Sequence, residues 1–534
     1  MNQKEIKRRQ IGLLADGMGF VILFLLVKIV GFESVVYIAA AYETMQLIWT
    51  VTGKSSTDAL GRILRSRRAK GQYKNAAIIG KNIIFLQGVT GLLGSILFAG
   101  VGGFFAGKVF GIPHAAAAFW ILAPALFLRN LSAALEGSFV GEGIQLASVI
   151  AGIMRRVFQG GFCVLFCSAL YRYGEKAGAL LILEEVRYQY AGIGFAIAIT
   201  LTELLVLLFM ILLYFGNRQS RKKESVEGGM RATENMTSSI GIYYSHAGLQ
   251  SLTLFLERLP IWLGMVLYLR YLQTHSSVSY GVFYGGFLIA AGLPAVLVCV
   301  LMIPVCVRTS AGIRREEMRY ARNGVQTGFQ SGIVYALFMT VFLAVTAAQS
   351  AELLGGTEHA RILTQCMQYG SAVVLFRVLI FYFSGVLSAT GKRLLVLIGY
   401  VTGNIAYLIA LIPMLNGGKL GILSLVDALV VGAGICCVVL GAFVFMQIGS
   451  GVDWLHCVLL PAIAAAVVGL ADLFLGKALA PHLGVVVTLL ICFVAAFLVF
   501  WILLLFTGCF REQDLKSVPC GSLIRKLGQL LRIY

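Results

Sequence analysis

Long apolar stretches recur along the whole chain and limit it to one class of fold. Each stretch has 18 or more residues and few charges, which is enough helix to cross about 30 Å of hydrocarbon. A bilayer core contains no water to satisfy the backbone, so such stretches are expected to be α-helices. The sequence predicts fourteen of them, near residues 11–30, 35–53, 82–107, 116–140, 144–170, 190–216, 238–262, 279–307, 324–349, 363–389, 394–416, 420–449, 454–476 and 483–507.

The composition excludes a soluble protein. Hydrophobic residues make up 59% of the chain, charged residues only 13%, and the mean hydropathy is +0.87, far from the averages of globular domains. The fold class predicted is an all-α polytopic membrane protein. The first stretch follows a basic head and lacks a small-residue cleavage site, which indicates a retained helix and not a signal peptide.

The net charge of +19 comes mostly from basic clusters between the stretches. An excess of Lys and Arg on one side marks the cytoplasmic face, which predicts that both termini are cytoplasmic. Clusters at an anionic leaflet contact lipid headgroups, so no nucleic-acid partner is expected. The eleven cysteines show no CxxC motif and no zinc-ligand spacing, so neither a metal nor a cofactor is expected. The clusters are Lys4–Arg9, Lys54–Lys81, Arg218–Arg231, Arg308–Arg322 and Arg511–Arg532.

An arginine deep inside an apolar stretch occurs twice in the same local pattern. Arg129 and Arg377 are each followed by glycine at +8 and +14, which suggests a duplicated bundle. Six helices per lobe give both lobes the same orientation around a central cleft, which suits transport by rocking. The predicted organisation is a first lobe at 1–216, a polar linker at 217–236, a second lobe at 237–449, two further helices at 450–510 and an amphipathic tail at 511–534.

Three stretches resemble a known family. They are the basic loop ending in Gly71-Gln-Tyr-Lys, the stretch APALFLRNLSAALEGSFVGEG, and SGVLSATGKR followed by LIGYVTGNIAYLIALIPML. The pattern is similar to the multidrug/oligosaccharidyl-lipid/polysaccharide (MOP) exporter superfamily, in the polysaccharide-biosynthesis branch that includes stage V sporulation protein B and the lipid II flippases. The resemblance covers most of the chain.

The resemblance implies both a fold and a function. It implies two pseudo-symmetric, MATE-like lobes of six helices in a bacterial cell membrane. By alternating access, these lobes would flip undecaprenyl-(pyro)phosphate-linked saccharides to the outer leaflet for cell-wall or surface polysaccharide synthesis. One departure argues against assigning lipid II as the substrate. Where the branch commonly has an Arg-Gly-x-x-Gln-Gly-like stretch, this chain has Glu136-Gly137-Ser-Phe-Val-Gly141.

Charged residues at membrane depth are the candidate site, because burying them in lipid is costly. One hypothesis is that the guanidinium groups bind a pyrophosphate, whose oxygens match the planar donor fork of arginine. The alternative is internal pairing of Arg129 with Glu136, of Arg258 with Glu257, and of Arg155 or Arg156 with Glu203. The basic candidates are Arg377, Arg129, Arg155, Arg156, Lys28 and Arg258, and the acids are Glu43, Glu203, Glu257 and Glu136.

Helical spacing adds two polar faces that are expected to line the cleft. One face lies on the second predicted helix and the other on the seventh. Acids on these faces could pair with arginine, or could instead carry H⁺ or Na⁺. The faces comprise Glu43, Gln46, Thr50 and Lys54, and Tyr243, His246, Gln250 and Glu257.

Four functions remain open on these grounds. The favoured one is a flippase for an anionic lipid-linked sugar, acting as a monomer in the bilayer. A cation-coupled multidrug exporter of the MATE type is the main alternative, although six deep basic residues argue against it. A membrane glycosyltransferase or polymerase has thin support, because the longest expected external loop, 171–189, offers only Glu175, Glu184, Glu185 and Arg187. No GxSxG motif, P-loop or strand followed by GxGxxG occurs, and no enzyme is expected. A scaffold for cell-wall machinery would not explain buried charges.

Overall fold

The computed structural model describes residues 3–217, 219, 234–271, 276–315, 317–418, 420–449, 453–479, 482–510, 515 and 518–530. Within these ranges every regular element is a helix, and 13 segments are long and apolar enough to cross a membrane. The prediction of an all-α polytopic protein is therefore confirmed. The linker residues 218 and 220–233, and the tail residues 511–514, 516–517 and 531–534, lie outside this description.

The first two predicted stretches are joined in one helix, α1 (Gln3–Thr52), which explains why 13 segments contain fourteen stretches. Gly31 interrupts this helix with φ 76° and ψ 168°, a conformation that glycine adopts without steric cost. The segments before and after it, 3–30 and 32–52, are each long enough to cross a bilayer at about 1.5 Å per residue.

The described helices form two compact units, Val21–Gly281 and Met1–Phe20 together with Val282–Tyr534, called here the 21–281 unit and the 282–534 unit. This grouping differs from the predicted lobe boundary at 216, because helix α9 (Met236–Tyr271) packs on α2 (Ser56–Ala69) and α3 (Tyr73–Phe104). Hydrogen bonds of 2.7 Å join Ser55 to Ser251 and Ser56 to Tyr243.

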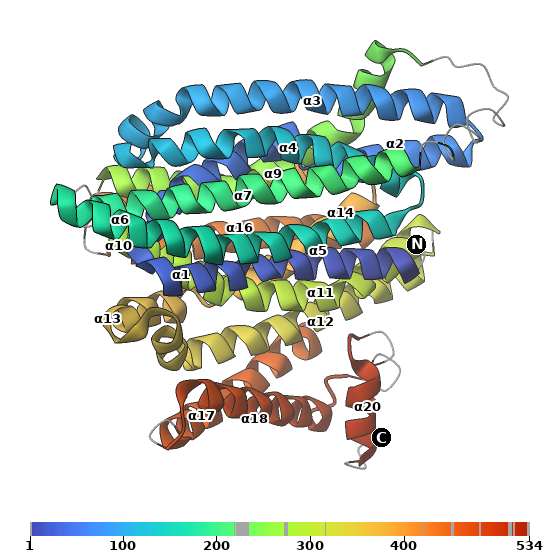
Figure 1. The fold of residues 1–534 in the computed structure, drawn as a ribbon. Coiled ribbons are helices and arrows are strands. Elements are labelled where there is room, and N and C mark those ends of the chain that lie inside the picture. The colour runs from blue at the N-terminus through green and yellow to red at the C-terminus, as the bar shows by residue number, and fades with distance from the viewer. Residues whose placement is uncertain are drawn as a thin grey trace. The chain divides into compact units, whose positions relative to one another are not determined.

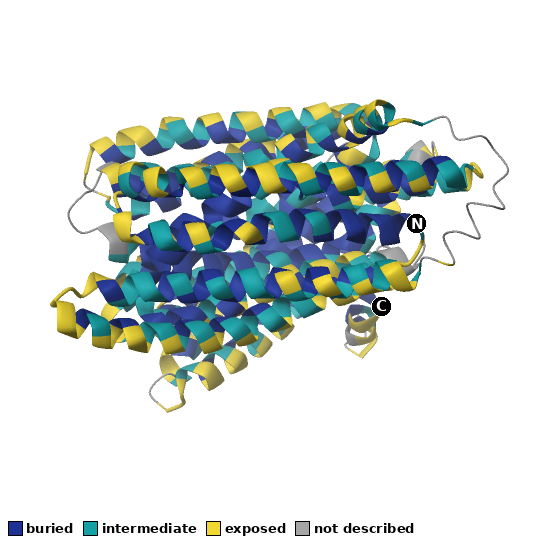
Figure 2. Ribbon diagram, turned by 45° about the horizontal axis from the view of Figure 1, so that its top comes forward, coloured by how far each residue is buried: buried dark blue, intermediate teal, exposed yellow. Residues whose placement is uncertain are grey.

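The 21–281 unit is built around α4 (Ala116–Gly141), which contacts α2, α3 and α7. Helices α3 and α4 run side by side (Figure 1). Buried and exposed residues alternate along the long helices (Figure 2), as expected for helices with one apolar face toward lipid. The other elements of this unit are η1 (Phe105–Val109), η2 (Pro113–Ala115), α5 (Gln145–Phe162), η3 (Cys163–Cys167), α6 (Ser168–Leu181), α7 (Glu185–Gly216) and α10 (Ser276–Val282).

In the 282–534 unit, α17 (Leu460–Leu479) and α18 (Val485–Phe506) pack together and against α12 (Met318–Val345). These are the two helices that follow the predicted lobes, and Figure 1 shows them as a red pair. The remaining elements are η4 (Phe283–Phe287), α11 (Leu288–Arg314), α13 (Ala347–Gly370), α14 (Ala372–Ala389), α15 (Arg393–Asn416), α16 (Leu423–Ile448), η5 (Leu455–Leu459) and α20 (Gly521–Leu530).

The glycines at +14 in the two arginine stretches end their helices in the same way. Gly143 has φ +86° and Gly391 has φ +79°. After α4, the N–H of Ile144 donates to the Phe139 carbonyl at 2.9 Å, and after α14 the N–H of Lys392 donates to the Leu387 carbonyl at 3.2 Å. Both are Schellman-type endings that need a residue in the left-handed region. The sequence repeat therefore corresponds to a repeated helix stop.

Gly91 of α3 allows α4 to approach closely at Asn130. A Cβ at Gly91 would lie 2.9 Å from Asn130 Cβ and 3.3 Å from Phe127 Cα. A Cβ at Gly88, one turn earlier on the same helix, would meet no atom within 4 Å. The first glycine is thus required by packing and the second is not.

We predict that Gly91→Ala lowers stability by about 1–3 kcal/mol, because the added methyl separates α3 from α4. Gly88→Ala is the matched control and is expected to be neutral or to gain up to about 1 kcal/mol from helix propensity. The melting temperature of each purified variant checks this. Equal melting temperatures for the two variants would contradict the packing described for α3 and α4.

Candidate functional site

The middle of α4 is shaped by Pro124, which cannot donate a backbone hydrogen bond. Ser95 of α3 enters the helix ladder there. Its hydroxyl donates to the Ala123 carbonyl at 2.6 Å and accepts from the Phe127 N–H at 3.1 Å. A side chain inserted into the i to i−4 ladder is a recognised cause of helix bending. Arg129 follows directly, so its direction depends on this local arrangement.

Arg129 is buried, with 7% of its surface exposed. Its guanidinium lies 3.7 Å from the centre of the Trp49 ring, and its Nε is 3.5 Å from Glu203 Oε1 on α7. A cation over an indole in a desolvated place gains about 2 kcal/mol. Trp49 and Glu203 together therefore offset part of the cost of burying this charge.

Arg155 of α5 completes a cluster of two arginines and two glutamates, called here the ionic ring. Its Nη2 donates to Glu136 Oε1 at 2.9 Å and its Nε donates to Glu203 Oε2 at 3.1 Å. Nη2 also lies 3.3 Å from the Ser132 hydroxyl. Glu203, only 2% exposed, thus lies between Arg129 and Arg155. The four formal charges cancel, and the ring ties α4, α5 and α7 together.

A second ion pair fixes α9 to the later segment of α1. Arg258 Nη1 lies 3.3 and 3.2 Å from the two carboxylate oxygens of Glu43, which is 3% exposed. One turn along α9, the Trp262 indole N–H donates to the Thr44 hydroxyl at 2.9 Å. These contacts explain why α9 belongs to the same compact unit as the later segment of α1 and helices α2–α7.

The structure shows which internal pairs form. Of the two arginines predicted as partners of Glu203, Arg155 forms the pair. Arg129 pairs with Glu203 and not with Glu136, because a separation of seven residues is about 10.5 Å along a helix. Arg258 pairs with Glu43 and not with Glu257, because adjacent helical residues point about 100° apart. Those two predicted pairings are therefore wrong, although internal pairing itself is extensive.

The predicted polar face of the seventh helix has both buried and exposed residues. Tyr243 is buried, and its hydroxyl also accepts a hydrogen bond from Gln87 at 3.0 Å. Gln250 accepts one from Arg62 at 2.7 Å, whereas His246 and Glu257 are exposed. On α1, Gln46 is buried, and Lys54 just beyond the helix is half-buried. Sequence reasoning missed Trp49, Ser55 and Ser251, because no charge or spacing marks them.

Three predicted cations lie outside the ring and the Glu43 pair. Arg156 of α5 is half-buried and donates to Gln159 at 3.0 Å. Lys28 of α1 is exposed, 5.8 Å from the Phe24 ring centre. Arg377 is half-buried on α14 in the 282–534 unit.

The helix predicted to place Arg377 at mid-membrane is interrupted. The stretch 363–389 is divided at Ser371, so Arg377 lies near the start of α14 and not within one continuous helix. Ser371 itself keeps helical angles, with φ −55° and ψ −34°, so the interruption is local.

Comparison with known proteins identifies the fold. No protein-family model matches the sequence, and no curated protein matches it significantly. Among solved structures, an inward-facing multidrug resistance MATE family transporter of the MOP superfamily matches with a TM-score of 0.65 and 14% identity, over 83% of this chain and 94% of that one. The lipid II flippase MurJ, in an inward closed conformation, matches with 0.62 and 12%, over 93% and 98%. The chain has the fold of MOP-superfamily transporters.

A eukaryotic MATE transporter gives a similar result, with a TM-score of 0.60 and 18% identity over 83% of this chain and 95% of that one. The predicted resemblance to the MOP superfamily is confirmed at the level of the fold. At such identities, the MOP fold is what the likeness establishes.

We predict that Glu203→Gln lowers stability by about 3–5 kcal/mol, because it leaves the buried Arg129 and the half-buried Arg155 without their shared carboxylate. Glu257→Gln on exposed α9 surface is the matched control, with an expected change within about 0.5 kcal/mol. Thermal melting of the purified variants measures both effects. A melting temperature for Glu203→Gln equal to that of the control would show that the ionic ring does not hold α4, α5 and α7.

Proposed function

We propose that this protein is a membrane transporter that moves an undecaprenyl-(pyro)phosphate-linked saccharide from the inner to the outer leaflet by alternating access. The observation that carries this proposal is the extent of the likeness to MurJ. It covers 93% of this chain, compared with 83% for the MATE structures. The difference of ten percentage points is about the length of the α17–α18 pair, which the predicted lobes do not include.

The ionic ring supports this function indirectly. Arg129 and Arg155 are already neutralised by Glu136 and Glu203, so their first role is to fix α5 against α4 and α7. Arg156 is the next residue on α5, and the ring therefore fixes its backbone. We assign anion binding in the 21–281 unit to Arg156 and Lys28, because neither belongs to the ionic ring and both side chains carry donors suited to phosphate oxygens.

Arg155 of the ionic ring could add a second guanidinium to an anion bound at Arg156. A pyrophosphate carries more charge than a carboxylate and presents several oxygens to a guanidinium fork. An incoming pyrophosphate at Arg156 would compete with Glu136 for the neighbouring Arg155. Arg377 is a third candidate, in the 282–534 unit, and its variant is tested separately.

A cation-coupled multidrug exporter is the second candidate, since the MATE structure has the TM-score of 0.65. Such an exporter needs carboxylates that can receive a cation. The three buried glutamates of the 21–281 unit, Glu43, Glu136 and Glu203, are all engaged by arginine. This engagement favours the anionic substrate.

We predict that Arg156→Gln slows flipping of a polyprenyl-pyrophosphate-linked saccharide about tenfold or more, because a charge-assisted contact contributes about 1.5–3 kcal/mol. Arg172→Gln is the matched control, since Arg172 lies exposed further along the same helical segment, Gln145–Leu181. Proteoliposomes with labelled substrate and an outer-leaflet quencher report the rate.

Full flipping by Arg156→Gln would remove Arg156 from the site. If the wild-type protein flips no anionic lipid but exports cationic dyes against a H⁺ or Na⁺ gradient, the multidrug exporter replaces the flippase. The same assay on Arg377→Gln reports the contribution of the other unit.

We also propose that the protein lies in a bacterial cell membrane with both termini cytoplasmic, because the basic clusters mark that side. The cysteines allow a test, since Cys520 is exposed, Cys306 is half-buried and the other nine are buried. A membrane-impermeant maleimide should label intact cells poorly and permeabilised cells at Cys520. Cys520→Ser should abolish this labelling. Strong Cys520-dependent labelling of intact cells would place the C-terminus outside.

A further inference from the structure

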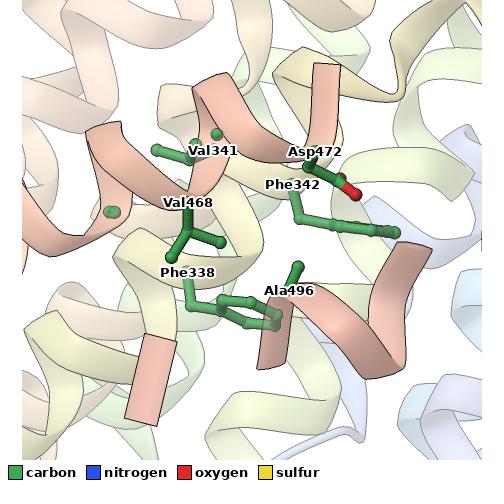
Figure 3. A pocket seen from close by; sticks show the side chains of 8 residues that line it. Phe338, Val341, Phe342, Val468, Asp472 and Ala496 are labelled. Atoms are coloured by element: carbon green, nitrogen blue, oxygen red, sulfur yellow. The ribbon is translucent and has the colours of Figure 1, made fainter. Parts of the chain in front are cut away.

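Asp472 of α17 is a buried acid outside the ionic ring and outside the two repeated lobes. Only 4% of its surface is exposed. Its side chain lines a small cavity between α12, α17 and α18 that has room for about one water molecule. The cavity walls are apolar and include Phe338, Val341, Phe342, Val468 and Ala496 (Figure 3).

The Asp472 carboxyl has no counter-charge in the described structure. Neither of its oxygens has a hydrogen-bond partner of good geometry, although the Cys492 thiol of α18 is close enough to interact with it. The charged residues nearest to it along α13 and α17, Glu352 and Lys477, are exposed. An ionised carboxylate in such surroundings is strongly disfavoured, and the group takes up a proton instead.

A metal cation does not fit this cavity. Hard cations take about six or more oxygen ligands, whereas this wall is carbon apart from the one carboxyl. The described residues hold no group of three or more His, Cys, Asp or Glu that could bind a metal. The cavity has room for about one water molecule, so the occupant that fits the chemistry is a proton, with or without a water.

Few titratable groups face Asp472 from the packed helices. Cys492 of α18 is close to Asp472. His456, which pairs with Asp453 at 2.7 Å, and Cys457 lie on η5, about 15 residues or roughly 22 Å of helix earlier in the chain. On α12, the titratable side chains precede the cavity-lining Phe338, and Tyr335 among them donates to the Pro519 carbonyl. The α12 groups are Arg319, Tyr320, Arg322 and Tyr335.

Polar groups continue from Asp472 toward the end of α17. Gly476 lies one turn further on, and a Cβ there would be 3.2 Å from Gln349 Nε2 and 3.9 Å from Cys492 Sγ. The absent side chain thus lets both groups approach α17. Gln349 Oε1 is itself buried without a hydrogen-bond partner. Cys492 and Gln349 therefore approach α17 one turn beyond Asp472, in the direction of the exposed Lys477.

We propose that Asp472 is a proton-binding site in the α17–α18 pair, holding a neutral carboxyl in the apolar cavity and exchanging its proton past Cys492 and Gln349. The site is independent of the anion site proposed above. On this proposal the α17–α18 pair binds and releases a proton in addition to packing against α12.

Infrared spectroscopy of the full-length protein in lipid nanodiscs tests this site. A protonated carboxyl has a C=O stretch separate from the bands of ionised carboxylates and amides. We expect such a band at neutral pH, its loss in Asp472→Asn, and its shift when H₂O is replaced by D₂O. Asp453→Asn is the matched control, because the hydrogen bond from His456 lowers the pKa of the exposed Asp453 carboxyl and keeps it ionised.

Two results would overturn the proposal. One is a spectrum of Asp472→Asn with the wild-type C=O band intact, which would mean that Asp472 is ionised. The other is an Asp472-dependent band that does not shift in D₂O, which would mean that the proton does not exchange. Asparagine has the shape of a protonated aspartate, so folding should be kept. If Asp472→Asn does not accumulate, Asp472→Glu keeps the acid and should displace the band.

Discussion

The placement of Glu203 between two arginines is the constraint on which the 21–281 unit depends. Any one of these charges alone would be too costly to bury in a membrane helix. Together, Arg129, Arg155, Glu136 and Glu203 are neutral, with Arg155 hydrogen-bonded to both glutamates and Arg129 paired with Glu203 by charge. Removing one partner of such a cluster costs far more than replacing the whole cluster. The ring therefore acts as a unit and sets the relative positions of α4, α5 and α7.

The ring in turn depends on backbone features that carry no charge. Ser95 enters the α4 ladder beside Pro124, and Gly91 lets α3 and α4 meet at Asn130. Both act within two turns of Arg129 and shape the part of α4 that carries it. Because the ring absorbs Arg129 and Arg155, the anion site proposed here rests on Arg156 and Lys28.

The sequence predicted the helices and the membrane-depth charges well, because a membrane-crossing helix needs a long apolar stretch and a buried charge is conspicuous there. It also offered Arg155 or Arg156 as a partner for Glu203, and Arg155 is the one that pairs. It did not predict that Arg129 would meet Glu203, or Arg258 meet Glu43. These pairs join helices distant in the sequence, and helical spacing constrains only residues on one helix. For the same reason the sequence did not indicate that Trp49 would contact Arg129. It also did not indicate the division of the predicted stretch 363–389 at Ser371, because the stretch is apolar on both sides of this residue.

The central claim is that this MOP fold binds an anionic lipid-linked sugar and not a cationic drug. Native mass spectrometry of the purified protein tests it most directly, by titrating undecaprenyl pyrophosphate, the neutral polyprenol of the same length and a cationic amphiphile. The account predicts preferential binding of the pyrophosphate, weakened by Arg156→Gln. Equal binding of the neutral polyprenol, or preferential binding of the cation, would contradict it.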